Sequence, residues 1–142
     1  MKHGRTYWEE LRSFESGSSR YLFGDELFWY ANPVPLGERE VRCILPVATL
    51  EEFIPYIDRF AEDLLRVISM YRYLGTHAFN ASLFFDKNRE ENGFSSFCSI
   101  ISRINPNPLS MSDSAFMERL HLEPVILTFP EDLADFFRNT CP

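Results

Sequence analysis

The sequence is poor in the residues that most often carry metal binding and nucleophilic catalysis. Its 142 residues include three histidines and three cysteines, with no H-x-H and no C-x-x-C spacing. Because zinc sites use about four such ligands at short spacings, the sequence predicts no metal site, and we expect no cofactor. Cys43 and Cys98 stand in apolar stretches, where a cysteine usually behaves as a small buried hydrophobe.

Lysines and long apolar runs are also scarce. Only Lys2 and Lys87 accompany twelve arginines, and 21 acidic residues bring the net charge to −7. An acidic protein repels phosphate backbones, which argues against nucleic acid as a partner. No segment approaches the ~18 uninterrupted apolar residues of a membrane helix, and the start, MKHGRTYWEEL, lacks the apolar centre of a signal peptide. We therefore expect a soluble, cytoplasmic protein with no membrane partner.

Aromatic side chains are abundant, with 14 Phe, 6 Tyr and 2 Trp in a sequence that is 45% hydrophobic. This composition excludes a disordered chain, and the length fits one domain. We predict an N-terminal helix and loop over residues 1–19 and a single domain over residues 20–142. An exposed aromatic patch that serves as a protein interface is one open hypothesis for these side chains: Trp8, Phe28, Trp29 and Tyr30.

The clearest predicted helix begins at Thr49, which forms a capping-box pattern with Glu52, and ends at Gly75. Pro55 either kinks its first turn or starts a second segment. Apolar residues recur along it at three- and four-residue steps: Phe53, Ile57, Phe60, Leu64, Ile68 and Tyr71. This stripe predicts that the helix packs on a sheet.

The other predicted elements are mainly strands in hairpins. They comprise a helix over 7–14, strands over 20–23, 26–31, 38–46, 77–85 and 94–104, a short helix ending at 120, a short strand or extended segment over 123–128 and a last helix over 129–139. Strands in hairpins around one long helix favour an antiparallel α+β domain. The two-residue period of the third strand places Val41, Cys43 and Leu45 on one face of the strand. It places Glu40, Arg42 and Ile44 on the other face.

Polar side chains gather on the strand pair within residues 75–108. An arginine and neighbouring amides can hold an anion, so this region is our candidate site for a phosphorylated ligand. The candidate residues are His77, Asn80, Ser82, Ser95, Ser99, Arg103 and Asn105. Structural roles stay open for several of them: a hydrogen-bonded His77, a solvated edge at Asn80 and Ser82, and an Arg103 that bridges loop carbonyls. No catalytic nucleophile is evident, and Cys98 is interpreted as a buried thiol.

Four motifs along the chain carry a family resemblance. They are EREVRCILP with its strand-ending proline, FNASLFF, FSSFCSIISRINP and the PE-led last helix in EPVILTFPEDLADFFR. Their order resembles the C-terminal half of galactose-1-phosphate uridylyltransferase-like proteins, which belong to the histidine-triad superfamily. The resemblance covers Arg20 to Arg138. It implies a histidine-triad-like antiparallel sheet with one long helix and shorter N- and C-terminal helices, in a superfamily that binds nucleotides and nucleotide sugars.

The resemblance also implies where chemistry would occur. Active members carry alternating histidines on one strand, and one of them attacks an α-phosphorus to form a nucleotidyl-enzyme. If Arg103 matches the basic residue that ends this strand, the three positions here are Ser95, Phe97 and Ser99. Phe97 cannot act as a nucleophile, and an unactivated serine is a poor one. A one-residue slip in register would exchange the faces of Phe97 and Cys98.

We therefore expect a catalytically degenerate, histidine-triad-like domain rather than an enzyme in its own right. It would bind a nucleotide sugar or a sugar phosphate, or serve as a dimerisation module in a homodimer. The alternative is the non-catalytic half of a uridylyltransferase-type nucleotidyltransferase that acts with a partner catalytic half on another chain or domain.

Overall fold

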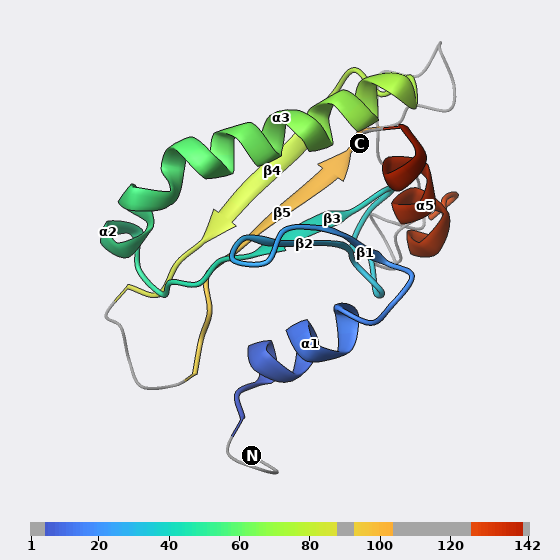
Figure 1. The fold of residues 1–142 in the computed structure, drawn as a ribbon. Helices are drawn as coiled ribbons and strands as arrows, with labels where there is room; N and C mark the ends of the chain where they lie inside the picture. Colours follow the sequence, from blue (N-terminus) through green and yellow to red (C-terminus); the bar gives the residue numbers. More distant parts are fainter. Residues whose placement is uncertain (1–4, 88–92, 104–125, 141–142) are drawn as a thin grey trace, which may run out of the picture.

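The computed structural model describes residues 5–87, 93–103 and 126–140, and this part of the chain forms one antiparallel sheet with helices on both faces (Figure 1). The strand order is β1-β2-β3-β5-β4. The strands are β1 (Tyr21–Phe23), β2 (Phe28–Ala31), β3 (Val41–Ile44), β4 (Phe79–Phe84) and β5 (Phe97–Ser102). The predicted α+β class is confirmed. The predicted short helix ending at 120 lies outside the described residues, and residues 126–128 form no strand.

The helices of the described residues are α1 (Tyr7–Glu15), α2 (Leu50–Phe53), the 3-10 turn η1 (Ile54–Tyr56), α3 (Ile57–Tyr73) and α5 (Pro130–Thr140). Capping boxes at Thr6 and Thr49 precede α1 and α2. The hydroxyl of Thr49 accepts a hydrogen bond from the backbone N–H of Glu52 at 3.4 Å. Pro55 lies in η1, so it starts a second segment rather than kinking one continuous helix. Gly75 follows α3 with φ +73°, the left-handed stop that glycine favours.

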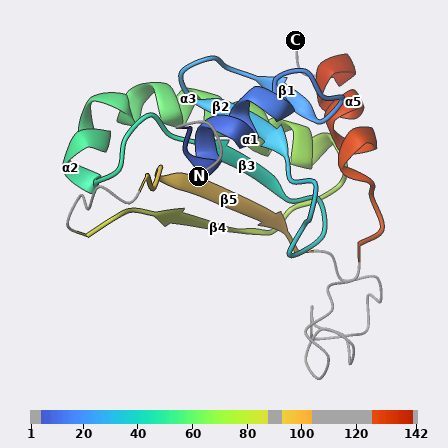
Figure 2. The same ribbon diagram turned by 90° about the horizontal axis from the view of Figure 1, so that it is seen from below.

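The two faces of the sheet are covered differently. The long helix α3 lies on one face and the shorter α1 on the other, as the two views show together (Figures 1 and 2). The main apolar core lies between the sheet and α3, and a smaller cluster of Phe28, Tyr30 and Ile44 packs beneath Trp8 and Leu11 of α1. On this second face, the β4 side chains of Asn80, Ser82 and Phe84 stay exposed.

The hypothesis of an exposed aromatic interface is wrong for β2. Phe28 is 3% exposed and Trp29 and Tyr30 are both 0% exposed, because helices cover both faces of this strand. The indole Nε1 of Trp29 donates to the buried Asp63 carboxylate at 3.2 Å, which ties β2 to α3. The aromatic excess therefore builds the core at this strand.

The predicted alternation along β3 and β5 is confirmed. Cys43 pairs with Cys98 across the two strands, and both side chains lie in the core under α3. Ile44 pairs with Phe97 on the opposite face. Since successive side chains in a strand point to opposite faces, Phe97 and Ser99 face away from α3. The register slip that would have buried Phe97 does not occur.

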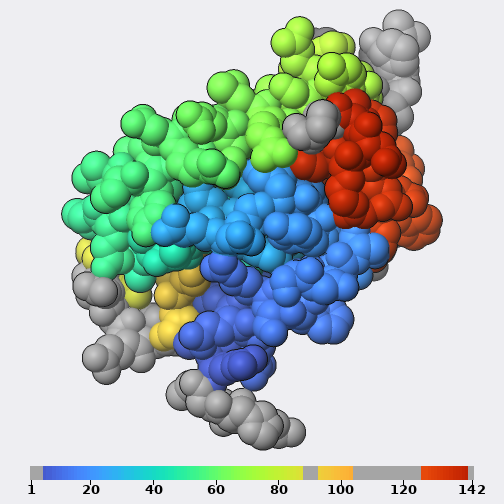
Figure 3. Space-filling view, viewed as in Figure 1, coloured from blue at the N-terminus to red at the C-terminus, as the bar shows by residue number. Residues whose placement is uncertain are grey.

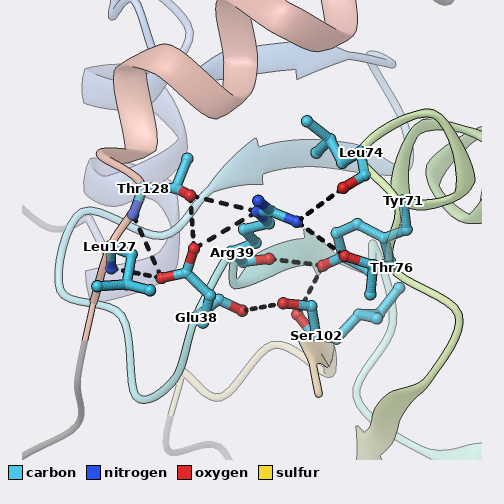
Figure 4. A network of polar contacts seen from close by, with 9 residues as sticks. Glu38, Arg39, Tyr71, Leu74, Thr76, Ser102, Leu127 and Thr128 are labelled. Carbon is cyan, nitrogen blue, oxygen red and sulfur yellow. Dashed lines mark hydrogen bonds and ion pairs between the residues drawn. The ribbon is translucent and has the colours of Figure 1, made fainter. Parts of the chain in front are cut away.

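A polar network fixes the start of β3 against two distant segments (Figure 4). Arg39 has φ +55°, which is uncommon for a residue with a side chain, and its carbonyl accepts a hydrogen bond from the Tyr71 hydroxyl at 2.6 Å. Its guanidinium donates to the Thr76 hydroxyl at 2.8 Å, and the neighbouring Glu38 carboxylate accepts from Thr128. These contacts hold together the end of α3, the start of β3 and the chain that enters α5.

The last helix packs beside α3 and over β1 and β2 (Figure 3). Phe137 stacks on Phe23 with ring centres 5.0 Å apart, and Glu131 in the first turn accepts from Arg20 at 2.7 Å. Arg20 also pairs with the buried Glu15 at the end of α1. No helix in the described ranges is long and apolar enough to cross a membrane.

Candidate functional site

Three neighbouring strands bring polar side chains into a row on the sheet face opposite α3. Arg42 of β3 pairs with Ser99 of β5, and Ser99 pairs with Ser82 of β4. Because paired residues in antiparallel strands share a face, these three side chains lie side by side. Ser82 is exposed, whereas Arg42 and Ser99 are partly buried. This row is the candidate site, and we call it the Arg42 row.

An aromatic stack lies next to the row. Phe97 packs between Trp8 of α1, at a ring-centre distance of 5.0 Å, and Phe84 of β4, at 4.5 Å with the rings 15° apart. The Arg42 guanidinium carbon lies 5.6 Å from the centre of the Phe97 ring, within cation–π range. Phe97 is therefore enclosed from both sides, and its ring supports Arg42.

The buried carboxylate of Glu40 orients the polar groups of the row. Glu40 is 2% exposed and accepts hydrogen bonds from Arg42 Nε at 2.7 Å and from the Ser99 hydroxyl at 2.6 Å. The backbone N–H of Leu36 donates at 2.6 Å and the Asn32 amide at 2.8 Å. Burial raises the pKa of Glu40, but these hydrogen bonds outweigh it and hold the pKa below its ordinary value. The carboxylate is thus ionised at neutral pH and fixes the Arg42 side chain.

Tyr30 places a hydroxyl beneath α1, near Arg42. Its side chain is fully buried, and its hydroxyl is the buried side-chain polar atom that has no hydrogen-bond partner within the described residues. The Arg42 guanidinium is close enough to act on it electrostatically without meeting hydrogen-bond geometry. Burial raises the pKa of Tyr30, partly offset by Arg42. The hydroxyl therefore stays protonated and can donate to an acceptor.

The sequence-predicted residues do not all meet. Ser82 and Ser99 are direct neighbours, and Asn80 is two pairs further along, opposite Ile101. Ser95 and Arg103 lie at opposite ends of β5, and eight residues of strand span about 26 Å. The Ser95 hydroxyl donates to the carbonyl of Leu45 at 2.6 Å. Ser95 and Arg103 therefore cannot contact the same small ligand.

The remaining candidates lie at the Arg103 end. The Arg103 backbone N–H donates to the Ala78 carbonyl at 2.8 Å, which continues the β4–β5 ladder past both strand ends. His77 and Arg103 are both exposed. Asn105 lies outside the described residues, so the anion site expected from Arg103 and its amides stays a prediction.

Ser95 lines a separate groove of about 560 Å³ at the other end of the sheet. Its walls include Pro46, Tyr56 and Phe94, together with Glu52, whose carboxylate caps α2 by accepting from Ala48 N–H at 3.0 Å. The groove thus combines apolar walls with polar groups that serve the local fold, and it is distinct from the Arg42 row.

Cys98 has no catalytic environment. Its side chain is 1% exposed under α3, and burial raises its thiol pKa to about 12. Because the thiolate is the reactive form, the thiol is inert at neutral pH. The interpretation of Cys98 as a buried structural thiol is confirmed.

Sequence reasoning missed the three residues that organise the site: Glu40, Arg42 and Trp8. The two-residue period placed Glu40 and Arg42 on the face opposite Cys43, and that face is shared with Phe97. This signal was present in EREVRCILP. Trp8 gave no comparable signal, because its contact with Phe97 depends on how α1 packs.

No protein-family model matches the sequence, and no curated protein matches it. Among solved structures, a uridylyltransferase aligns with TM-score 0.73 and 17% identity over 97% of this chain and 45% of its own. A mutant uridylyltransferase aligns with TM-score 0.72 and 16% identity over 97% of this chain and 47% of its own. A Zn-bound histidine triad family protein from Mycobacterium smegmatis aligns with TM-score 0.56 and 16% identity over 92% of this chain and 93% of its own.

At these identities the likeness shows the fold. The chain has the α+β fold shared by the uridylyltransferase and histidine-triad structures, as the sequence resemblance predicted. It spans less than half the length of the two uridylyltransferase chains it matches and nearly the whole of the histidine-triad protein. The comparisons therefore show a histidine-triad-like fold.

Proposed function

We propose that this histidine-triad-like domain binds a nucleotide sugar or a sugar phosphate without transferring any part of it. The observation that carries the proposal is the stack of Trp8, Phe97 and Phe84 on the sheet face. The resemblance assigns an attacking histidine to the strand that holds Phe97. A benzene ring packed on both sides offers no lone pair, so this position supplies no nucleophile.

The neighbouring serine does not replace the missing imidazole. Ser99 donates to Glu40, and general-base activation would need this carboxylate to accept the hydroxyl proton. The pKa of Glu40 is lowered by its hydrogen bonds, which makes it a weaker base than an ordinary carboxylate. The pair therefore favours a hydrogen-bonded serine over an activated one.

The Arg42 row supports binding. Glu40 engages Arg42 through Nε, so the two terminal nitrogens have no acidic partner among the described residues. Their planar fork suits two phosphate oxygens. Ser82 and Asn80 are exposed on the same face and can bond sugar hydroxyls, and the edge of Phe84, 44% exposed, offers an apolar surface to a sugar or a base.

Isothermal titration with a uridine diphosphate sugar tests this proposal. We expect saturable binding that weakens on the order of 10-fold or more in Arg42→Ala, because charged hydrogen bonds contribute ~1.5–3 kcal/mol. Arg72→Ala is the matched control, since Arg72 is exposed at the far end of α3 and should leave the affinity unchanged. Equal affinity in Arg42→Ala and the parent protein would exclude the Arg42 row as the site.

A second candidate is the C-terminal, non-catalytic half of a uridylyltransferase-type enzyme that completes its site with a partner chain or domain. It is favoured by the coverage, since 97% of this chain matches 45% of a uridylyltransferase chain. The same titration separates the two candidates. A self-sufficient binding domain gives binding heat without a partner. A half that contributes to a shared site gives no binding heat by itself.

Both candidates predict that the isolated chain performs no uridylyl transfer. Intact-mass spectrometry after incubation with the uridine diphosphate sugar should show only the unmodified protein. A covalent uridylyl adduct on this chain would overturn both candidates, because each places no nucleophile on the strand.

A further inference from the structure

Tyr30 continues the Arg42 row beneath α1. Tyr30 of β2 pairs with Arg42 of β3, which in turn pairs with Ser99 of β5. Because paired residues in antiparallel strands share a face, the Tyr30 ring lies beside the Arg42 side chain on the α1 side of the sheet. The line of polar groups that begins at the exposed Ser82 therefore ends at a buried tyrosine.

The hydroxyl of Tyr30 is buried and unpartnered. The residue is 0% exposed, and its hydroxyl has no hydrogen-bond partner within the described residues. Tyr71, the other fully buried tyrosine of the described chain, instead donates to the carbonyl of Arg39 at 2.6 Å. A buried polar group without a partner is unfavourable, and native structures contain few of them. The apolar neighbours Phe28 and Ile44 would pack equally well on a phenylalanine, so packing does not account for the hydroxyl.

Arg42 selects the kind of acceptor that this hydroxyl can meet. Glu40 accepts from Nε of Arg42, which leaves the two terminal nitrogens without an acidic partner in the described ranges. The guanidinium also acts electrostatically on the Tyr30 hydroxyl, which places the two groups near each other. A planar fork takes two oxygens of an anion, and the hydroxyl needs a further one. A phosphate offers three or more oxygens, whereas both oxygens of a carboxylate are used by the fork.

The helix α1 covers the hydroxyl, so a phosphate reaches it only when α1 moves (Figure 2). Glu15 is the one buried residue of α1, and it ties the end of the helix to Arg20 at 3.0 Å. Towards the start of the helix, Trp8 and Leu11 pack on the sheet as partly buried side chains. A segment that buries few apolar side chains opens at a low free energy. The start of α1 can therefore move while its Glu15 end and the sheet stay in place.

We propose that the Tyr30 hydroxyl and the Arg42 guanidinium form a phosphate site beneath α1, which opens when the start of this helix moves away from the sheet. The terminal nitrogens of Arg42 hold two phosphate oxygens, and Tyr30 donates to a third. This inference rests on the proposed function for its ligand, because it assigns the phosphate of the nucleotide sugar or sugar phosphate to these two residues. The sugar then extends along the Arg42 row toward Ser82.

Tyr30→Phe tests the inference, because it removes one oxygen and keeps the ring. The unliganded variant loses an unsatisfied group, so its melting temperature should stay unchanged or rise by a few degrees. Its dissociation constant for a uridine diphosphate sugar, measured by isothermal titration, should rise on the order of 10-fold, because a hydrogen bond to a charged group is lost. A purely structural hydroxyl would not weaken binding. Tyr21→Phe is the matched control, since Tyr21 pairs with Tyr30 and its hydroxyl donates to the Gly24 carbonyl at 3.4 Å.

Tryptophan fluorescence follows the movement of α1. Trp8 is partly buried on α1, whereas Trp29 is 0% exposed in the core. Saturation with the uridine diphosphate sugar should shift the emission to longer wavelengths as Trp8 enters water, and Trp8→Phe should abolish this shift. An unchanged emission at saturation would show that α1 stays in place, which overturns the inference.

The inference is also overturned if Tyr30→Phe binds as tightly as the parent protein, or if the unliganded variant melts at a clearly lower temperature. If Arg42→Ala weakens binding and Tyr30→Phe does not, the inference fails and the proposed function stands. If the uridine diphosphate sugar does not bind, titration with inorganic phosphate decides. Phosphate binding that both substitutions weaken keeps the phosphate site and rejects the nucleotide sugar, and absence of phosphate binding rejects both.

Discussion

At the scale of single residues, Glu40 holds the sheet face together. Its carboxylate accepts from two side chains across the row, Arg42 and Ser99, and from the backbone of Leu36. Glu40→Gln keeps the shape and removes the charge, which leaves Arg42 without its ionic partner in a partly buried place. We expect the free energy of unfolding to fall by about 2–4 kcal/mol, measured by urea unfolding. A change within about 0.5 kcal/mol would contradict the importance assigned to this carboxylate.

The same carboxylate predicts a pH dependence. The folded-state pKa of Glu40 lies below the value of about 4.3 in an unfolded chain. Its stabilising contribution is therefore complete above about pH 4.3 and is lost as the pH falls through the lower, folded-state pKa. The stability difference between the parent protein and Glu40→Gln should be constant near neutrality and shrink under acid conditions. A difference that grows on acidification would show that the sign is wrong.

At the scale of elements, Trp8 packs α1 against the sheet. Its ring contacts Phe94 and Phe97 and packs on the cluster beneath α1, whereas the adjacent Tyr7 is 66% exposed. Trp8→Ala should lower the free energy of unfolding by about 2 kcal/mol, less than the ~3–5 kcal/mol of a fully buried aromatic residue. Tyr7→Ala is the neighbouring control and should change it by less than about 0.5 kcal/mol. Similar losses in the two variants would contradict the assigned orientation of α1.

Element positions follow from local signals, and these could be predicted from the sequence. The capping box at Thr49, the interruption of the helix at Pro55 and the left-handed stop at Gly75 each depend on a few neighbouring residues. The alternation that turns Phe97 away from the core depends only on the period of a strand. Local chemistry therefore predicted the fold class and the face of each residue in β3 and β5.

The site depends on contacts between distant segments, and local signals do not encode them. Ser82 and Ser99 come together because β4 pairs with β5 in one register, and Glu40 reaches Ser99 because β3 lies beside β5. Ser95 and Arg103 lie beyond the two ends of the strand that holds Ser99. They are too far apart to belong to one site with Ser99. The candidate residues predicted from the sequence therefore include one true neighbouring pair, Ser82 and Ser99, together with residues that lie elsewhere in the structure.

At the scale of the whole molecule, the domain has the size of a histidine-triad protein and less than half the size of the uridylyltransferase chains it matches. One face of its sheet carries the Arg42 row, and the proposed ligand binding belongs to this face.

The most direct test of the central claim follows the Arg42 side chain during ligand titration. In ¹H–¹⁵N spectra, the Nε–H signal of Arg42 is identified by its loss in Arg42→Ala. We predict that this signal shifts saturably as a uridine diphosphate sugar is added, while the sugar nucleotide remains chemically unchanged. A signal that stays in place while the ligand binds elsewhere, or a ligand that is cleaved by the isolated chain, would contradict the account.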